Sequence, residues 1–196
     1  MSIMPAPASF QHPTIEIKRV RPALLDRFGG LPGYKTEWAA AIDLIACIEE
    51  PLTIHPLDGS VLIPTGIAVN MGRPDMVGLM FPRSSTGHKR ALVLGNGTGV
   101  IDPDYQGEIM ISLCSRLPSV KRTVPGRLGR WLLGICPHAK FQADAQIDDN
   151  RVTVVEPGER LAQLVFLPII RPVFEEVQEF GLSSARGAGG FGSTGR

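Results

Sequence analysis

The sequence predicts an all-β domain in which short strands form a sandwich or jelly roll. Roughly ten short segments have strand-like patterns and are separated by turn residues, as in these folds. The 17 prolines and 22 glycines stand in short clusters, which is typical of turns between strands rather than of helices. With 43% hydrophobic residues, a chain of 196 residues can bury one sizeable core but falls short of two full domains.

The strands are expected in the following order. Residues 14–20 alternate polar and apolar side chains, which predicts a first strand with Ile15 and Ile17 on one face. Glycine and proline pairs make 29–34 a loop. The apolar run of 161–170 is typical of a buried strand. The other expected strands are 52–54, 60–70, 76–81, 108–113, 151–155 and 173–180, with 91–94 leading into the central stretch.

This central stretch, 95–109, is predicted to be a hairpin. Three glycines at alternate positions at its start would permit positive φ and the close approach of a flat ligand. A short strand then ends at Asp102, and Tyr105 follows a Pro-Asp turn. An open backbone edge, a carboxylate and an aromatic ring together suit recognition of a planar group and acid–base chemistry beside it. The alternative is an ordinary β-turn with a solvated carboxylate.

Two other segments carry charge in informative places. Asp43 stands inside the apolar run 39–47, where a charge is costly unless it is paired, hydrogen-bonded or near a metal. Residues 82–90 combine arginine, lysine, hydroxyls and glycine, which suits phosphate oxygens, although the spacing is not that of a P-loop. The alternative for this segment is a basic surface turn, with His88 as a surface or capping residue.

Three further segments lie outside the regular strand pattern. Residues 1–13, rich in proline, alanine and serine, are expected to be a flexible N-terminal tail before a β domain at 14–180. The insert 117–150 begins basic, turns apolar and ends acidic, so its centre is expected to pack on the domain or at a subunit contact. The glycine-rich arm 181–196 carries arginines, hydroxyls and one phenylalanine, which could close over a ligand; the alternative is a disordered end.

Composition limits the compartment and the partners. A formal net charge of +1 gives no case for a nucleic-acid polymer or an anionic membrane. The N-terminal segment lacks the features of a signal peptide, and no apolar run is long enough to span a membrane. Cys47, Cys114 and Cys136 show no CxxC spacing, which favours reduced thiols over a disulfide framework or a zinc site. A cytoplasmic protein is therefore expected.

Taken together, five segments resemble the five motifs of the trimeric dUTP pyrophosphatase (dUTPase) family. They occur in the family's order and tie together most of the chain from residue 41 onward. The third and fifth are each quite specific. The segments are 41–44 (Ala-Ile-Asp-Leu), 82–85 (Pro-Arg-Ser-Ser), 99–107 (Gly-Val-Ile-Asp-Pro-Asp-Tyr-Gln-Gly), 157–163 (Pro-Gly-Glu-Arg-Leu-Ala-Gln) and 186–195.

The resemblance implies a homotrimer of jelly-roll subunits with three active sites at subunit interfaces, each closed by a C-terminal arm. The implied reaction converts dUTP and water to dUMP and pyrophosphate with Mg²⁺, which keeps uracil out of DNA and supplies dUMP for thymidylate synthesis. Asp102 would be the general base for the water that attacks the α-phosphorus. Asp43 would help to hold the hydrated Mg²⁺. The phosphate chain would be held by Arg83, Ser84, Ser85 and Gln163.

The same resemblance assigns the base, the sugar and the arm. Asn96 and the backbone around Val100 and Ile101 would read the uracil edge. Tyr105 would pack under the deoxyribose and leave no room for a 2′-hydroxyl, and Met110 would line the same pocket. The arm would supply Phe191 to stack on uracil, and Arg186, Ser193 and Thr194 to bind the γ-phosphate.

Two alternatives remain at this level. A dCTP deaminase shares the fold, and Ser85, where dUTPases usually have glycine, is a deaminase-like feature. That enzyme needs a glutamate on the strand after the third motif, where this chain has Ser112, and Glu108 comes too early. The second alternative is a non-catalytic nucleotide-sensing protein of the same fold that contacts partners through the insert, a segment longer than the connection usual in the family.

Overall fold

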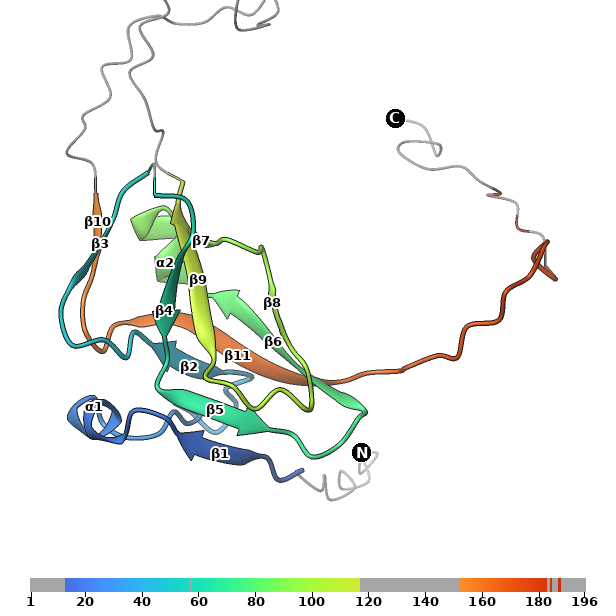
Figure 1. The fold of residues 1–196 in the computed structure, drawn as a ribbon, viewed down its shortest axis with the longest axis horizontal. Helices are drawn as coiled ribbons and strands as arrows, with labels where there is room; N and C mark the ends of the chain where they lie inside the picture. The colour runs from blue at the N-terminus through green and yellow to red at the C-terminus, as the bar shows by residue number, and fades with distance from the viewer. Residues whose placement is uncertain (1–12, 57, 117–151, 183, 185–186, 188–196) are drawn as a thin grey trace, which may run out of the picture.

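The structure, a computed structural model, describes residues 13–56, 58–116, 152–182, 184 and 187. Strands dominate these residues, which confirms the predicted all-β fold (Figure 1). The elements are β1 (Glu16–Arg19), α1 (Pro22–Arg27), β2 (Ile42–Ile45), β3 (Leu52–Ile54), β4 (Val61–Pro64), β5 (Ile67–Asn70), β6 (Met76–Pro82), α2 (Ser84–Arg90), β7 (Leu92–Leu94), β8 (Gly99–Ile101), β9 (Met110–Ser115), β10 (Thr153–Val155) and β11 (Arg160–Pro168).

The strands pair antiparallel in two main sheets and two smaller pairs. One sheet has the order β2-β11-β6-β8 and the other the order β4-β9-β7, while β1 pairs with β5 and β10 pairs with β3. Buried side chains from both main sheets form one hydrophobic cluster, so the sheets share a single core. Its fully buried members include Leu44, Ile63, Met80, Leu92, Ile111, Leu113 and Leu164.

The predicted strand 60–70 is wrong as a single element, because it is broken into β4 and β5. The break lies at Thr65 and Gly66. Gly66 has a φ of +79°, and a Cβ there would lie 2.6 Å from the Sγ of Cys47. The Thr65 hydroxyl donates to the carbonyl of Ile109 at 2.7 Å and fixes the bend. The chain thereby leaves the sheet of β9 and continues beside β1.

The predicted hairpin at 95–109 is also wrong in its pairing. β7 pairs with β9 in one sheet, whereas β8 pairs with β6 in the other, so residues 95–98 carry the chain between the two sheets. Of the three alternate glycines, only Gly97 has a positive φ, of +73°. Gly95 and Gly99 are needed for space instead, because a Cβ would meet the hydroxyl of Ser60 in the first case and the side chain of Met80 in the second.

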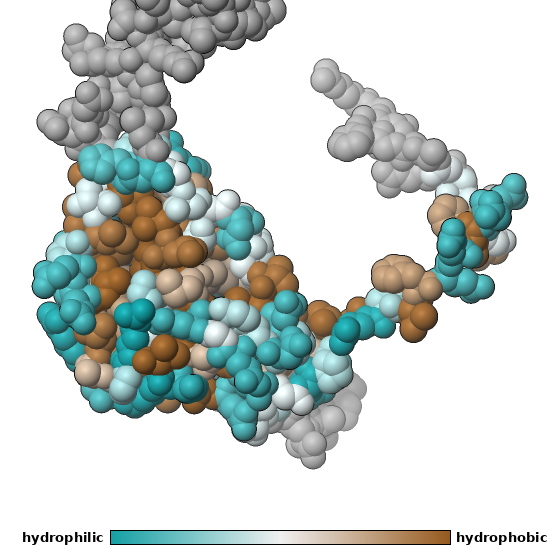
Figure 2. Space-filling view, viewed as in Figure 1, coloured by the Kyte–Doolittle hydropathy of each residue, from teal (hydrophilic) through white to brown (hydrophobic). Residues whose placement is uncertain are grey.

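The predicted strand at 173–180 does not form. Within the described chain no strand pairs with this segment, which leaves the domain after β11 (Figure 1). Most of its apolar side chains are almost fully accessible, with Val173 97% and Phe174 89% exposed, although Val177 is 50% exposed. The segment stands apart from the body of the domain (Figure 2). A strand needs a neighbouring backbone to pair with, and the segment's own chain does not provide one.

The two helices found among the described residues, α1 and α2, are not predicted from the sequence. α1 begins at Pro22, a favoured first helical residue, and it buries Leu25 in the core. The basic segment 82–90 forms α2 rather than a surface turn, and His88 lies exposed in its last turn. The helix ends at Ala91, whose φ of +53° is in the left-handed region.

Several expectations lie outside the described residues. These are nearly all of the N-terminal tail 1–13, the packing of the insert 117–150 and most of the arm 181–196. In the part of the chain that the structure describes, no helix is long and apolar enough to cross a membrane.

Replacing Ala91 with glycine is expected to stabilise the fold. A left-handed alanine costs about 1–2 kcal/mol, and glycine at this position avoids that strain. Glycine also loses more backbone entropy on folding, which offsets part of the gain. Ala91→Gly should therefore raise the free energy of unfolding by about 0.5–1 kcal/mol. Urea titration at fixed protein concentration measures the difference. Ala23→Gly, within α1, is the matched control and should lower stability; a loss of stability in both variants would contradict the strain at Ala91.

Candidate active site

The two main groups of predicted site residues lie at opposite ends of β6. Ile101 pairs with Gly78, so Asp102, the next residue, is level with the start of β6. Arg83 follows the other end of the same strand. Six residues of strand separate these levels, which amounts to about 20 Å. Figure 1 shows α2 and the turn after β8 at these opposite ends. The structure therefore does not bring Asp102 and Arg83 together within one chain.

At the α2 end, three of the sequence motifs meet side by side. Gln163 on β11 pairs with Asp43 on β2 and with Phe81 on β6. The amide Nε2 of Gln163 also donates to the carbonyl of Pro82 at 3.4 Å, next to Arg83. Antiparallel pairing across the central strand thus gathers residues that are far apart in the sequence.

Asp43 forms an ion pair with two arginines. Its Oδ1 lies 2.9 Å from Nε of Arg83, and its Oδ2 accepts from Nη1 of Arg160 at 3.1 Å. The carboxylate is largely buried, with 15% of its side chain exposed. These contacts satisfy the expectation that a charge in this apolar run is paired. Among the described residues, no three histidine, cysteine or acidic side chains gather into a metal cluster.

The serines of the second motif are the first two residues of α2. Ser84 is exposed and Ser85 is half-buried. The helix is held on the sheet because the hydroxyl of Thr86 donates to the carbonyl of Leu161 at 2.7 Å. Ser84, Ser85 and Arg83 therefore present polar groups from one rigid corner, beside the Asp43 ion pairs.

At the other end, β8 forms an open strand edge. In the described chain it pairs only with β6, so the backbone groups along its far side face away from the sheet. Val100 is 60% exposed on this strand. Asn96 is exposed in the turn before it, where its carbonyl accepts the N–H of Thr98 at 2.8 Å. Ile101 and Met110 are half-buried. This open edge can accept a planar ligand through main-chain hydrogen bonds.

Tyr105 is fixed in the turn that follows Asp102. Its N–H donates to the carbonyl of Asp102 at 3.1 Å, and its hydroxyl donates to the carbonyl of Glu108 at 3.1 Å. The end of the ring lies over Gly107, where a Cβ would come within 2.5 Å of the hydroxyl oxygen. The absence of a side chain at Gly107 is therefore what allows the ring to lie across its own turn.

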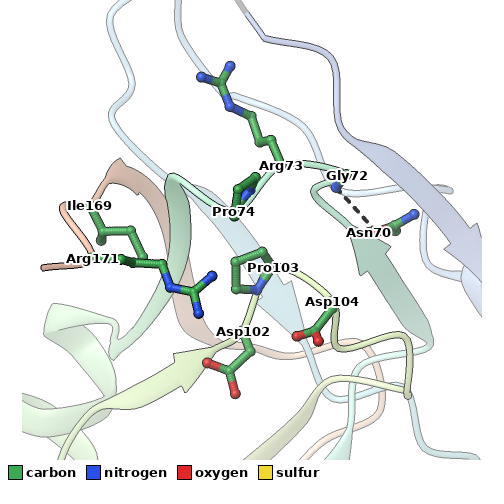
Figure 3. A pocket seen from close by; sticks show the side chains of 9 residues that line it. All are labelled: Asn70, Gly72, Arg73, Pro74, Asp102, Pro103, Asp104, Ile169 and Arg171. Atoms are coloured by element: carbon green, nitrogen blue, oxygen red, sulfur yellow. Dashed lines mark hydrogen bonds between the residues drawn. The ribbon is translucent and has the colours of Figure 1, made fainter. Parts of the chain in front are cut away.

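Asp102 is exposed and lines a cavity of about 490 Å³ (Figure 3). Other lining residues come from the same turn, from the β5–β6 loop and from the segment after β11. Sequence reasoning missed the last two groups, because their residues come from the end of β5 and from loops that carry no recognisable motif. The missed lining residues are Asn70, Gly72, Arg73, Pro74, Ile169 and Arg171.

Glu108 has a structural position. Its carboxylate accepts from Nε and Nη2 of Arg21 at 2.8 and 3.2 Å, and from the N–H of Gly66 at 2.9 Å. The hydrogen bond to Glu108 raises the pKa of Arg21. Glu108 thus joins the residue before α1 to the bend between β4 and β5, which does not favour the deaminase alternative. The predicted arm residues Arg186, Phe191, Ser193 and Thr194 lie outside the described residues.

Comparison with known proteins gives consistent matches over most of the chain. A family model described as dUTPase matches residues 29–152 and 147–195. Deoxyuridine 5′-triphosphate nucleotidohydrolase of Psychrobacter cryohalolentis is 41% identical over 183 residues, which cover 93% of this chain and 97% of that protein. The protein of the same name from Xanthomonas oryzae pv. oryzae is 43% identical over 176 residues, covering 88% and 92%.

The fold has a similar counterpart among solved structures. Staphylococcus bacteriophage 80alpha dUTPase with dUPNHPP superimposes with a TM-score of 0.65 at 27% sequence identity. The match covers 93% of this chain and 99% of that chain. The similarity therefore extends over nearly the whole of both chains.

Removing the charge of Asp43 is expected to destabilise the domain. Asp43→Asn leaves Arg83 and Arg160 facing each other without a carboxylate, so the free energy of unfolding should fall by about 2 kcal/mol. Asp26→Asn is the control, because it removes a carboxylate that pairs with Arg19 but is 64% exposed; its effect should stay below about 0.5 kcal/mol. Equal effects in urea titrations would show that the Asp43 ion pairs contribute no more to the free energy of unfolding than the exposed Asp26–Arg19 pair.

Proposed function

Because the chain belongs to the dUTPase family, we propose that it hydrolyses dUTP to dUMP and pyrophosphate. The observation that carries the proposal is the retention of the family's motif residues at both ends of β6. An exposed carboxylate beside an open strand edge stands at one end, and a cluster of polar phosphate-binding groups stands at the other. The first group suits the base and the attacking water, and the second suits the phosphate chain of a nucleoside triphosphate.

We propose that each active site is shared between subunits of a homotrimer. A dUTP molecule needs the base, the α-phosphorus and the rest of the phosphate chain within one pocket, but about 20 Å separate the two groups along β6. Asp102 of one subunit therefore works with Arg83, Ser84, Ser85 and Gln163 of a neighbour. The exposed apolar segment after β11 supports assembly, because side chains such as Ile170 and Phe174 need a partner to cover them.

In the proposed reaction Asp102 is the general base. Its exposed carboxylate takes a proton from the water that attacks the α-phosphorus, and pyrophosphate leaves. Arg83, Ser84, Ser85 and Gln163 orient the phosphates and stabilise the charge on their oxygens. The arm residues Arg186, Ser193 and Thr194 are proposed to bind the γ-phosphate, and Phe191 to stack on uracil.

Mg²⁺ is the proposed cofactor, and it supplies charge neutralisation at the phosphate oxygens. Asp43 fits a role through water: each carboxylate oxygen is engaged by one arginine, and each keeps a lone pair that can accept from a metal-bound water. Magnesium retains several of its waters and needs few direct protein ligands, so a single carboxylate that is 15% exposed is adequate.

Selection of base and sugar is proposed to come from the turn region. Asn96 and the backbone at Val100 and Ile101 read the uracil edge, for which the free edge of β8 is available. Tyr105, held over Gly107, packs against the deoxyribose and excludes a 2′-hydroxyl, with Met110 beside it. We place the enzyme in the cytoplasm, consistent with the free thiols of Cys47 and Cys114.

An assay with several nucleotides tests the activity directly. Purified protein with Mg²⁺ should release pyrophosphate from dUTP and much less from dCTP, dTTP or UTP. Asp102→Asn should lower kcat by about two to four orders of magnitude with substrate binding largely kept, because the carboxylate acts mainly on the attacking water. Ammonia release from dCTP, or a normal kcat in Asp102→Asn, would refute the proposed reaction or the proposed base respectively.

Mixed trimers test whether the site is shared. Asp102→Asn and Arg83→Ala should each be inactive alone. Co-expressed at equal levels, they should recover about a quarter of wild-type activity, since one interface in four joins an intact Asp102 to an intact Arg83 from its neighbour. The control is a double variant carrying both substitutions in one chain, mixed with wild type. Activity that stays at background in the first mixture would show that both residues act within one chain.

A further inference from the structure

The ring of Tyr105 is held by contacts to two residues that follow it in its own turn. Its hydroxyl donates to the carbonyl of Glu108 at 3.1 Å. A Cβ at Gly107 would lie 2.5 Å from the same hydroxyl oxygen, so the end of the ring lies directly against this glycine. Tyr105 nevertheless remains 44% exposed. The hydroxyl end of the ring is therefore fixed on the protein, while much of the ring stays open to a ligand.

The carbonyl that accepts from Tyr105 has its direction set by the peptide unit to which it belongs. The N–H of that unit is the N–H of Ile109, which donates to the carbonyl of Ile67 on β5 at 2.9 Å. In a planar trans peptide unit the N–H and the C=O point in opposite directions. The carbonyl of Glu108 therefore points away from β5, and there the Tyr105 hydroxyl meets it.

The side chain of Glu108 gives the same residue a second anchor. Its carboxylate, 15% exposed, accepts from Nε and Nη2 of Arg21 at 2.8 and 3.2 Å and from the N–H of Gly66 at 2.9 Å. A bidentate bond between charged groups is strong, and a largely buried carboxylate that loses such a partner is left poorly satisfied. Arg21 stands 87 residues away in the sequence, yet it helps to hold the residue on which the Tyr105 ring rests.

We propose that Arg21 and Glu108 are positioning residues for Tyr105, and that their ion pair controls how strictly a nucleotide with a 2′-hydroxyl is excluded. The inference rests on the proposed function, in which Tyr105 packs against the deoxyribose. Neither positioning residue touches the sugar; both act through the carbonyl of Glu108 and the hydroxyl that donates to it. A side chain that excludes one extra hydroxyl group must keep its place to within about 0.5 Å, which is why a remote ion pair affects the selection. Both residues lie outside the five motif segments.

The test is the ratio of kcat/KM for dUTP to kcat/KM for UTP, measured with Mg²⁺ on purified variants. Arg21→Gln removes the bidentate pair and should lower this ratio about fivefold, the effect expected from weakening one hydrogen bond. Arg21→Lys keeps the positive charge but not the bidentate geometry, so it should recover part of the ratio. Tyr105→Phe removes only the hydroxyl donor and should lower the ratio by a similar factor. Because both nucleotides are hydrolysed by the same active molecules, partial loss of folded protein leaves the ratio unchanged.

A double variant separates this route from a general effect on the fold. If Arg21 acts through the Tyr105 hydroxyl, Arg21→Gln should lower the ratio in the wild-type background and cause no further loss in the Tyr105→Phe background. Arg19→Gln is the matched control. The Arg19 side chain has a similar exposure, 40% against 42% for Arg21, but it pairs with Asp26, so its replacement should leave the ratio unchanged.

Three results would overturn the inference. The first is an unchanged ratio in Arg21→Gln. The second is an equal loss in both backgrounds, which would mean that Arg21 acts by another route. The third is a proportional fall in kcat/KM for both nucleotides, which would mean that the ion pair serves the fold alone. Failure of the proposed function has a different signature, because wild-type protein would then release no pyrophosphate from dUTP.

Discussion

The pairing of β11 with β6 is the constraint on which the rest of the structure depends. Seven residue pairs, from Ala162–Pro82 to Pro168–Met76, form this ladder at the centre of the larger sheet. β2 pairs with the other edge of β11 and β8 with the other edge of β6. The ladder therefore fixes where Asp43, Arg83 and Gln163 meet. It also fixes Asp102 at the opposite end, since the register of β8 is set on β6. A slip of one residue would turn every side chain on β11 to the wrong face.

The Asp43 ion pairs show how one cluster can serve both the fold and the proposed chemistry. A carboxylate with 15% exposure loses hydration, and the two arginines compensate for that loss. The same contact holds the guanidinium of Arg83 in place before substrate arrives, so less side-chain entropy is lost on binding phosphate. Arg160 then holds the second oxygen of Asp43, which keeps the carboxylate from following Arg83 toward a ligand.

Much of the fold could be predicted from sequence because the residues of β1, β6, β9 and β11 have alternating or continuous apolar patterns. The failures share a physical cause: pairing partners are not encoded locally. The 60–70 run looks continuous, yet the chain bends at Gly66. There the backbone lies against Cys47 with no room for a side chain, and the Thr65 hydroxyl hydrogen-bonds to the carbonyl of Ile109. Residues 95–109 look like a hairpin, yet β8 pairs with β6, while the strand that follows, β9, pairs with β4 and β7 in the other sheet.

The site shows the same division. Asp43, Arg83, Asp102 and Tyr105 could be selected from sequence as candidate site residues, because they stand in motifs with distinctive neighbours. Arg73 and Arg171 could not, because only the tertiary fold brings their loops to the Asp102 turn. The ion pairs of Asp43 could be anticipated as a requirement, but not the identity of both arginines. Nor does local sequence reveal that Asp102 and Arg83 lie at opposite ends of β6.

That separation has a consequence for how the protein would be regulated by its own assembly. In the proposed trimer, neither end of β6 can carry out the reaction alone, so an isolated chain is inactive whatever its stability. The exposed apolar segment after β11 gives the isolated chain a reason to associate, because burying such side chains is worth about 25 cal/mol per Å². The association that buries this segment also brings Asp102 of one chain to the phosphate-binding groups of another. Activity then depends on the fraction of the chain that is assembled as a trimer. At high dilution it reports the stability of the trimer rather than that of the fold.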